Sequence, residues 1–180
     1  VLKINDDQIE DILSIDGGAI IKDDKFVDRL PKNESQGYNF IINKVKSGTL
    51  EIPNPEEDNK FVALEIRSSK TKTKLDYNGN TLKYKKIIKV RTTLGEAQKS
   101  VSLTNEEIDK ITKRAEKNIE VACKDVFNKY KNRDLDIFDV QKDFHKKYPK
   151  KDSKDIFKDT EIEVEAHVYL EGSSNKLNFR

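Results

Sequence analysis

One turn signal constrains the fold of this chain more than any other feature of its sequence. Asn78-Gly79 lies between two arms that are rich in β-branched and aromatic residues and extend from about Lys70 to Arg91. Asn and Gly both tolerate a positive φ, which the two-residue type I′ turn of a β-hairpin requires. The sequence therefore predicts a long antiparallel hairpin, whose apolar face must be covered by another layer of structure.

The register of this hairpin follows if Asn78 and Gly79 are its two turn residues. Counting outward from the turn gives four cross-strand pairs: Leu75 with Leu82, Thr73 with Tyr84, Lys74 with Lys83, and Lys72 with Lys85. The four lysines then share one face, where directly opposed like charges weaken a hairpin unless solvent and salt screen them. These lysines are therefore either a solvated face or a candidate contact with anionic lipid headgroups or an acidic partner surface.

Further strands are predicted where apolar residues alternate with polar ones between turn residues. They are a hairpin formed by 19–22 and 25–30 around Asp23-Asp24, a strand at Leu50 and Ile52 ending at Pro53, a strand from Phe61 toward Tyr77, a separate strand from Thr92 to Ser102, and a half-buried strand from Ile162 to Leu170. Together they predict one main sheet that is antiparallel or mixed.

Helices are predicted where apolar residues recur every three or four positions. Thr104 and Glu107 form a capping box, and a long apolar stripe follows: Ile108, Ile111, Ala115, Ile119, Ala122, Val126 and Tyr130. Shorter helices are predicted from Asn5 to Leu13, from Asn33 to Gly48, and after Asp136 as far as Pro149. The expected fold class is α+β, with the long amphipathic helix and the shorter helices packed against the sheet.

Length and composition favour a single domain that spans residues 1–180. Charged residues make up 38% of the chain, yet its formal net charge is only +2, and Lys outnumbers Arg by 29 to 6. This balance is typical of a solvated surface, so nucleic acid is not an expected partner. No apolar run is long enough to span a bilayer, and Val1 begins no signal or lipidation motif, so we expect any anchor to be removed or to lie upstream.

The sequence contains no recognisable catalytic, metal-binding or cofactor-binding motif. No nucleophile is paired with a base, and no glycine loop has the spacing that cradles a phosphate. His145 and His167 share no ligand spacing and are expected at the surface, while Cys123 is expected to be a packed core thiol. We therefore predict no catalytic residue, no metal site, no cofactor and no enzymatic activity. An enzyme whose site combines scattered carboxylates is a less favoured interpretation.

The order of several segments resembles a known family. The stretches Asp136-Ile137-Phe138-Asp139-Val140 and Phe144-His145-Lys146-Lys147-Tyr148-Pro149 resemble the pattern "Asp, hydrophobic, Phe, Gly, Phe, then a short helix ending near Tyr-Pro" of the Ger(x)C family of spore germination proteins. The hairpin at 18–27, the segments Ser35-Gln36-Gly37-Tyr38, Val62–Ile66 and Gly95-Glu96, the long helix and the last strand follow in the family's order. The resemblance covers nearly the whole chain and points to the family's C-terminal domain. The chain departs from the pattern at Asp139, where the family has glycine, and it lacks the family's tryptophans.

The resemblance implies a non-enzymatic ectodomain of a germinant receptor C-subunit lipoprotein. Such a subunit is tethered by lipid to the outer face of the spore inner membrane, and it works with the receptor's A and B membrane subunits in nutrient-triggered germination. Its anchor would be absent from this chain. The alternative interpretation is a module, unrelated to germination, that binds a polyanion or a membrane surface.

Overall fold

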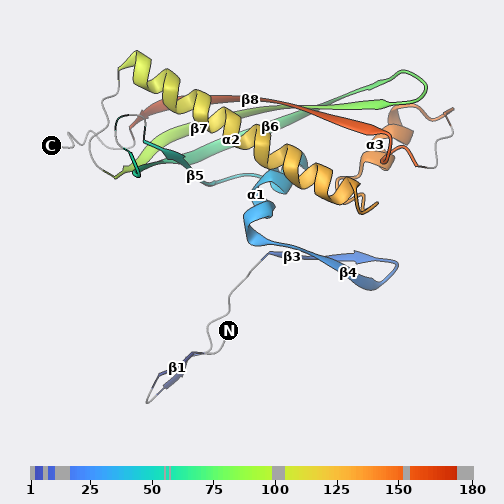
Figure 1. Cartoon of the computed structure of the whole chain (residues 1–180), viewed down its shortest axis with the longest axis horizontal. Helices are drawn as coiled ribbons and strands as arrows, with labels where there is room; N and C mark the ends of the chain where they lie inside the picture. The colour runs from blue at the N-terminus through green and yellow to red at the C-terminus, as the bar shows by residue number, and fades with distance from the viewer. Residues whose placement is uncertain are drawn as a thin grey trace. The chain divides into compact units, whose positions relative to one another are not determined.

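The computed structural model describes residues 3–5, 8–10, 17–54, 56, 58–98, 104–151 and 155–173. The chain divides into two compact units, Val1–Ser35 and Gln36–Arg180. Over the described residues the elements are three helices, one of them long, and strands arranged in a four-stranded sheet and two small hairpins. The fold class is therefore α+β, as the sequence predicts (Figure 1).

The first unit contains two antiparallel hairpins. Their strands are β1 (Lys3–Asn5) with β2 (Gln8–Glu10), and β3 (Gly18–Lys22) with β4 (Lys25–Leu30). The second hairpin is the predicted one, and its turn residues Asp23 and Asp24 have φ values of 50° and 60°. Two consecutive residues with positive φ are what a type I′ turn requires, and Asp reaches this region more readily than most residues.

The helix predicted from Asn5 to Leu13 is wrong over the part that the structure describes. Residues 3–5 and 8–10 pair as strands, with Ile4 opposite Ile9, while 11–13 lie outside the described residues. A helix of about two turns forms few hydrogen bonds, so it needs support from a cap or from packing to offset its nucleation, as α3 (Val140–Lys147) has from Asp136. The short apolar pattern was compatible with both structures, and the local pairing of two β-branched residues decides between them.

The first helix, α1 (Lys32–Ile41), is shorter than predicted. Asn43 has a φ of 58°, so the right-handed helix cannot continue to Gly48. The Asn43 side chain is held by the sheet, because its Oδ1 accepts a hydrogen bond from the backbone N–H of Thr71 at 2.7 Å. Asn tolerates the left-handed conformation well, and this long-range hydrogen bond fixes the end of the helix.

The main sheet has four strands in the order in which they follow along the chain. They are β5 (Gly48–Pro53), β6 (Phe61–Tyr77), β7 (Leu82–Ala97) and β8 (Thr160–Ser173). The first three are antiparallel neighbours, whereas β8 runs parallel to β7, so the sheet is mixed. A parallel neighbour needs a crossover, and the two remaining helices lie in that connection. The separate strand predicted from Thr92 is wrong, because β7 continues unbroken to Ala97; residues 99–102 lie outside the described residues.

A bulge in β6 decides which of its side chains face solvent. Ile66 pairs with Thr92 and Ser68 with Arg91, so Arg67 is an extra residue in the ladder. An extra residue reverses the alternation of a strand from that point on. Even-numbered residues up to Ile66 are buried, whereas beyond the bulge the even-numbered lysines are exposed.

The turn of the long hairpin has four residues rather than the two predicted. Tyr77 pairs with Leu82, so residues 78–81 form the loop. The Asn78 Oδ1 accepts hydrogen bonds from the backbone N–H groups of Asn80 and Thr81, at 3.0 and 2.8 Å. An Asn side chain that bonds the backbone in this way stabilises a wider turn.

The predicted register is therefore wrong by two residues. The observed pairs are Lys74 with Lys85, Asp76 with Lys83, and Lys72 with Ile87. Because side chains alternate with a period of two, this shift changes the partner of each lysine but leaves it on the predicted face. Of the four lysines, Lys83 therefore faces an aspartate, and Lys74 and Lys85 are directly opposed to each other.

The long helix α2 (Asn105–Lys131) begins at the predicted cap, where the Thr104 hydroxyl accepts a hydrogen bond from the Glu107 backbone N–H at 3.3 Å. It crosses the sheet and packs on β8 and β5 (Figure 1). Its buried side chains are Ile111, Ala115, Ile119, Cys123, Val126, Phe127 and Tyr130. This confirms the predicted stripe, apart from Ile108 and Ala122, which are half-buried at its border. Cys123 is the predicted core thiol, and burial raises its pKa to about 12.

Helix α1 approaches α2 closely at Gly37. A Cβ atom at this position would lie 2.5 Å from the carbonyl oxygen of Ala122, and the Gly37 carbonyl accepts a weak hydrogen bond from the Cys123 thiol at 3.5 Å. Backbone atoms cannot yield as a flexible side chain does. Gly37 therefore sets the distance between the two helices.

Replacing Gly37 by Ala is expected to lower the free energy of unfolding by about 2 kcal/mol, because overpacking outweighs the higher helix propensity of Ala. Chemical denaturation followed by circular dichroism measures this loss. Gly18→Ala is the matched control, since its Cβ would meet only the Leu30 Cβ, at 3.8 Å. Equal stability of the Gly37→Ala and unmodified chains would contradict the close helix contact.

The last helix, α3 (Val140–Lys147), begins four residues later than its predicted cap, Asp136. The Asp136 carboxylate nevertheless caps it, accepting hydrogen bonds from the N–H groups of Phe138, Val140 and Gln141 at 3.2, 3.0 and 2.8 Å. Asp139 has a φ of 59°, a conformation that glycine adopts without strain. The left-handed residue Asp139 is thus the position at which the family that this sequence resembles has glycine.

Asp136→Ala is expected to cost about 2 kcal/mol of unfolding free energy, since it leaves three partly buried N–H groups without their acceptor. Asp136→Asn keeps one acceptor oxygen in the same place and should cost clearly less. Denaturation midpoints of the two variants, measured side by side, test the cap. Equal losses would show that the charge, rather than the acceptor geometry, is what matters.

Candidate functional site

The outer face of the main sheet carries the four lysines that the sequence singles out. Lys72 and Lys74 project from β6 beyond its bulge, and Lys83 and Lys85 project from β7. Lys72, Lys74 and Lys83 are exposed, and among the described residues none of the three has an ion pair; Lys85 is half-buried. The structure therefore places the four lysines on one face. Lys85 differs from the other three because it is half-buried and ion-paired.

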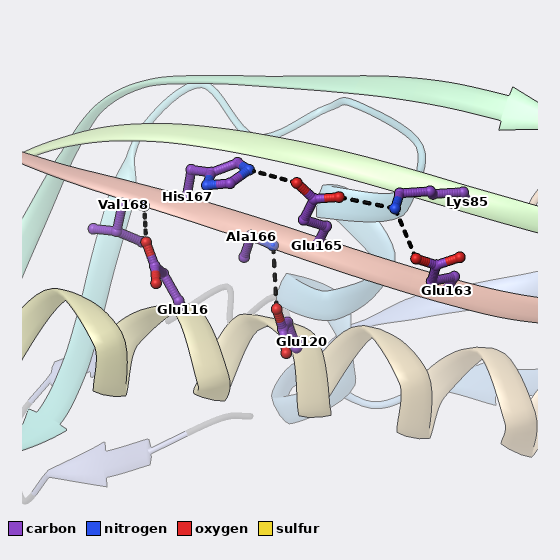
Figure 2. A network of polar contacts seen from close by, with 8 residues as sticks. All are labelled: Lys85, Glu116, Glu120, Glu163, Glu165, Ala166, His167 and Val168. Carbon is purple, nitrogen blue, oxygen red and sulfur yellow. Dashed lines mark hydrogen bonds and ion pairs between the residues drawn. The ribbon is translucent and has the colours of Figure 1, made fainter.

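Lys85 is held by two glutamates of β8. Its Nζ lies 2.7 Å from Glu163 and 2.9 Å from Glu165, and Figure 2 shows it between the two carboxylates. The hydrogen bonds to Glu163 and then to Glu165 raise the pKa of Lys85 to about 12. Glu165 also contacts the ring of His167, with Nε2 at 2.9 Å, and its pKa is lowered by Lys85 first and by His167 second. His167 lies in the outward register of β8, as predicted. The positive charge of Lys85 is balanced by its two carboxylate partners.

The free edge of β8 is partly closed by the long helix. Glu116 Oε1 accepts a hydrogen bond from the Val168 N–H at 2.9 Å, and Glu120 Oε1 accepts one from the Ala166 N–H at 3.3 Å (Figure 2). These N–H groups point away from β7, so no strand of the sheet bonds to them. Two helix side chains thus take the place of a fifth strand.

A buried lysine lies on the opposite, core-facing side of β7. Lys86 is only 3% exposed, and its neighbours on that face, Tyr84 and Ile88, are fully buried. Its Nζ donates a hydrogen bond to the Thr73 Oγ1 at 2.8 Å and lies 4.2 Å from the centre of the Tyr84 ring. Burial lowers its pKa to about 8, although the nearby Asp143 carboxylate opposes this shift.

The polar surroundings of Lys86 come from three other elements. The Tyr84 hydroxyl donates to Asp143 of α3 at 3.1 Å, and burial together with this carboxylate raises the Tyr84 pKa. The other polar neighbours of Lys86 are Cys123 of α2 and Thr73 of β6. This cluster around Lys86 was not predicted from the sequence. Its signal was the alternation of β7, where a lysine stands at 86 in the buried register between Tyr84 and Ile88.

Over the described residues, no group of three or more His, Cys, Asp and Glu side chains is placed to hold a metal ion. His145 is exposed on α3, and His167 lies on β8 beside Glu165. In the same part of the chain, none of the helices has both the length and the apolar character needed to cross a bilayer. The arrangements that the structure offers are a charged sheet face, a shielded strand edge and a buried lysine cluster.

Comparison with known proteins identifies the family. The family model described as "Spore germination B3/ GerAC like, C-terminal" matches residues 16–174. The spore germination protein GerQC of Bacillus cereus is 25% identical over 132 residues, which cover 73% of this chain and 37% of that protein. The crystal structure of the GerBC protein superimposes with a TM-score of 0.74 at 21% identity, over 86% of this chain and 51% of that one. The chain thus spans about half or less of the length of these relatives.

The GerBC likeness shows that this chain shares its fold, the mixed sheet with its crossing helix, with the GerBC protein. The family match extends over almost all of the described residues, from the β3–β4 hairpin to β8. This chain belongs to the GerAC-like, or Ger(x)C, family of spore germination proteins and corresponds to the family's C-terminal domain.

Proposed function

We propose that this chain is the C-terminal ectodomain of a spore germinant receptor C-subunit lipoprotein, and that it acts by binding and assembly rather than by catalysis. In the full-length protein, a lipid anchor would hold it at the outer face of the spore inner membrane, beside the receptor's A and B membrane subunits. The observation that carries this proposal is the family match over residues 16–174. The names of the relatives support a role in germination, and the GerBC fold supports the domain assignment.

The polar groups of the described residues are consistent with a binding role. Carboxylates on the sheet face are engaged with Lys85 and His167, and Asp143 accepts a hydrogen bond from Tyr84. Cys123 is fully buried and its raised pKa keeps the thiol protonated, so it is a poor nucleophile. A binding surface therefore accounts for the exposed charges better than a reaction centre does.

The test is made in spores of the organism that encodes the protein. Spores whose full-length protein lacks only this domain should lose germination through the cognate receptor, while germination triggered without receptors stays intact. A tagged full-length protein should also co-purify with the A and B subunits from solubilised spore membranes. A normal nutrient response in the deletion spores would exclude the proposed role.

A second candidate function is contact with an anionic membrane surface through Lys72, Lys74 and Lys83. These three lysines are exposed on the face of the sheet opposite α2, whereas Lys85 is engaged by two glutamates. A lysine close to an anionic bilayer adds about 1 kcal/mol of attraction, and the attraction decreases as salt is added. Three free ammonium groups on one rigid hairpin could therefore bring this face to lipid headgroups.

Changing Lys72, Lys74 and Lys83 together to Gln is expected to weaken binding to phosphatidylserine vesicles at low salt by roughly tenfold or more. Vesicle co-sedimentation over a salt series measures the effect. The matched control changes Lys110, Lys113 and Lys117 of α2 to Gln, which removes the same charge from exposed positions on another element. If both triple variants lose binding equally, or if the unmodified chain does not bind, the hairpin face is not a membrane contact.

A further inference from the structure

A cavity of about 640 Å³ lies between the outer half of the long hairpin and α3. Its walls are formed by Thr73, Lys74 and Leu75 of β6 and by Asp143, Lys146 and Lys147 of α3. Cavities of a few hundred cubic ångströms are typical of sites for small molecules. Thr73 also bonds Lys86, and Asp143 also bonds Tyr84, so the buried lysine cluster lies directly behind these walls.

The cavity opens onto a free stretch of strand edge. β5 pairs with β6 only as far as Ile66, so among the described strands none pairs with the outer half of β6 on that side. Two side chains occupy this edge, because the Thr71 N–H donates to Asn43 and the Leu75 carbonyl accepts from Lys147. Backbone groups of alternate residues point the same way, so the Thr73 N–H between them points into the gap. Side chains thus occupy the edge on both sides of Thr73, and they hinder a pairing strand more than a small ligand that bonds the Thr73 N–H.

The positively charged side chains that line the cavity favour an anionic ligand. Three lysines, at 74, 146 and 147, line the cavity with one aspartate, Asp143, which already accepts the Tyr84 hydroxyl, and Lys86 lies behind the wall at Thr73. None of the lining residues is an arginine, and the negative end of the helix dipole at the last turn of α3 opposes a dianion such as phosphate more strongly than a monoanion. The Leu75 side chain and the lysine stems provide apolar surface beside the ammonium groups.

We propose that this cavity binds a small organic monoanion through its carboxylate, with the N–H and hydroxyl of Thr73 as donors, the Lys86 ammonium behind Thr73 adding attraction, and an apolar body against Leu75. Lys146, which is exposed at the rim, adds attraction as the ligand enters. Such binding is a property of this chain by itself and does not depend on its proposed place in a receptor.

The pH dependence distinguishes Lys86 from the surface lysines. The titratable groups that face its ammonium are Asp143 from α3, Cys123 from α2 and Tyr84 from its own strand. Because Lys86 has a pKa of about 8, it loses its proton well before an exposed lysine does. Carboxylate affinity should therefore fall as the pH rises through about 8, although the bound anion will raise this value somewhat.

The experiment titrates the ¹⁵N-labelled 180-residue chain with acetate, butyrate, phenylacetate and inorganic phosphate. We expect saturable shifts of the Thr73 amide signal, with affinity that increases from acetate to phenylacetate as more apolar surface is buried. Lys86→Met should weaken the binding by roughly tenfold, because it removes the positive charge that lies behind Thr73. Lys89→Met, an exposed lysine on the outer face of the same strand, is the matched control and should leave the affinity within about twofold.

Several results would overturn the proposal. They are the absence of a saturable shift, tighter binding of phosphate than of every carboxylate, and equal affinities of the Lys86→Met and Lys89→Met variants. The pH profile of the unmodified chain needs no variant, so it decides the question even if Lys86→Met alters the fold. A midpoint near 10 instead of near 8 would assign the binding to surface lysines.

Discussion

Ile111→Asp is expected to unfold this domain at ordinary temperature. Ile111 is fully buried in the stripe through which α2 packs on the sheet. An ionised carboxylate at that position would have no partner in the apolar core, at a cost of several kcal/mol beyond the lost packing. Domains of this size are stable by only about 5–15 kcal/mol, so the variant should lose most or all of its cooperative transition. Thermal unfolding followed by circular dichroism measures this effect.

Val121 provides the matched control for this substitution. It lies on the same helix but is 42% exposed, so Val121→Asp introduces the same charge and a similar helix propensity without burying it. This variant should unfold within about 0.5 kcal/mol of the unmodified chain. In spores, comparing germination of the Ile111→Asp and Val121→Asp variants distinguishes an effect of unfolding from an effect of a lost surface contact. Equal unfolding midpoints for the two variants would refute the packing of α2 on the sheet.

The stability of the chain should depend on pH through Lys86 by about 3 kcal/mol. The pKa of Lys86 falls from 10.5 to about 8 on folding, and one pKa unit corresponds to about 1.36 kcal/mol. Between these pH values the unfolded chain binds one more proton than the folded chain, so the contribution of Lys86 to the unfolding free energy rises with pH. Below about pH 8 the folded chain carries the full cost of a buried ammonium.

Lys86→Met removes this cost, together with the hydrogen bond to Thr73 and the contact with the Tyr84 ring. Those two interactions are worth about 1 kcal/mol each, so we expect the variant to be more stable at pH 7 by about 1 kcal/mol. The sign should reverse near pH 10, where neutral Lys86 no longer carries a penalty. Urea unfolding of both chains at the two pH values tests this, with Lys89→Met to correct for general charge effects. A difference that does not change with pH would show that Lys86 titrates as an exposed lysine.

The long elements of the fold could be predicted from the sequence because several local signals agree for each of them. At α2 the Thr104 cap, the apolar period and the first buried residue, Ile111, all indicate one helix, and the structure has it. At residues 3–10 a few apolar positions fitted either a helix or a hairpin, and no cap or turn signal was strong enough to decide. The end of α1 depends on the bond from Asn43 to Thr71, a contact between distant residues that periodicity does not reveal.

The candidate site was only partly predictable, for two physical reasons. The Asn-Gly pair indicated a turn correctly, but its length depends on whether the Asn78 side chain bonds the backbone, as it does here. The ion pairs of Lys85 depend on β8, which joins β7 only after a crossover of more than sixty residues. Lys86, by contrast, could have been found, because a lysine in the buried register of a central strand breaks the alternation around it.

The two glutamates that close the edge of β8 have a consequence for how copies of this domain can coexist. An edge strand with open N–H groups is a template for pairing with another chain, and crowding on a surface favours such pairing. Here Glu116 and Glu120 occupy the N–H groups of Val168 and Ala166 in the middle of the strand. Copies concentrated side by side would therefore pair less readily through the middle of β8.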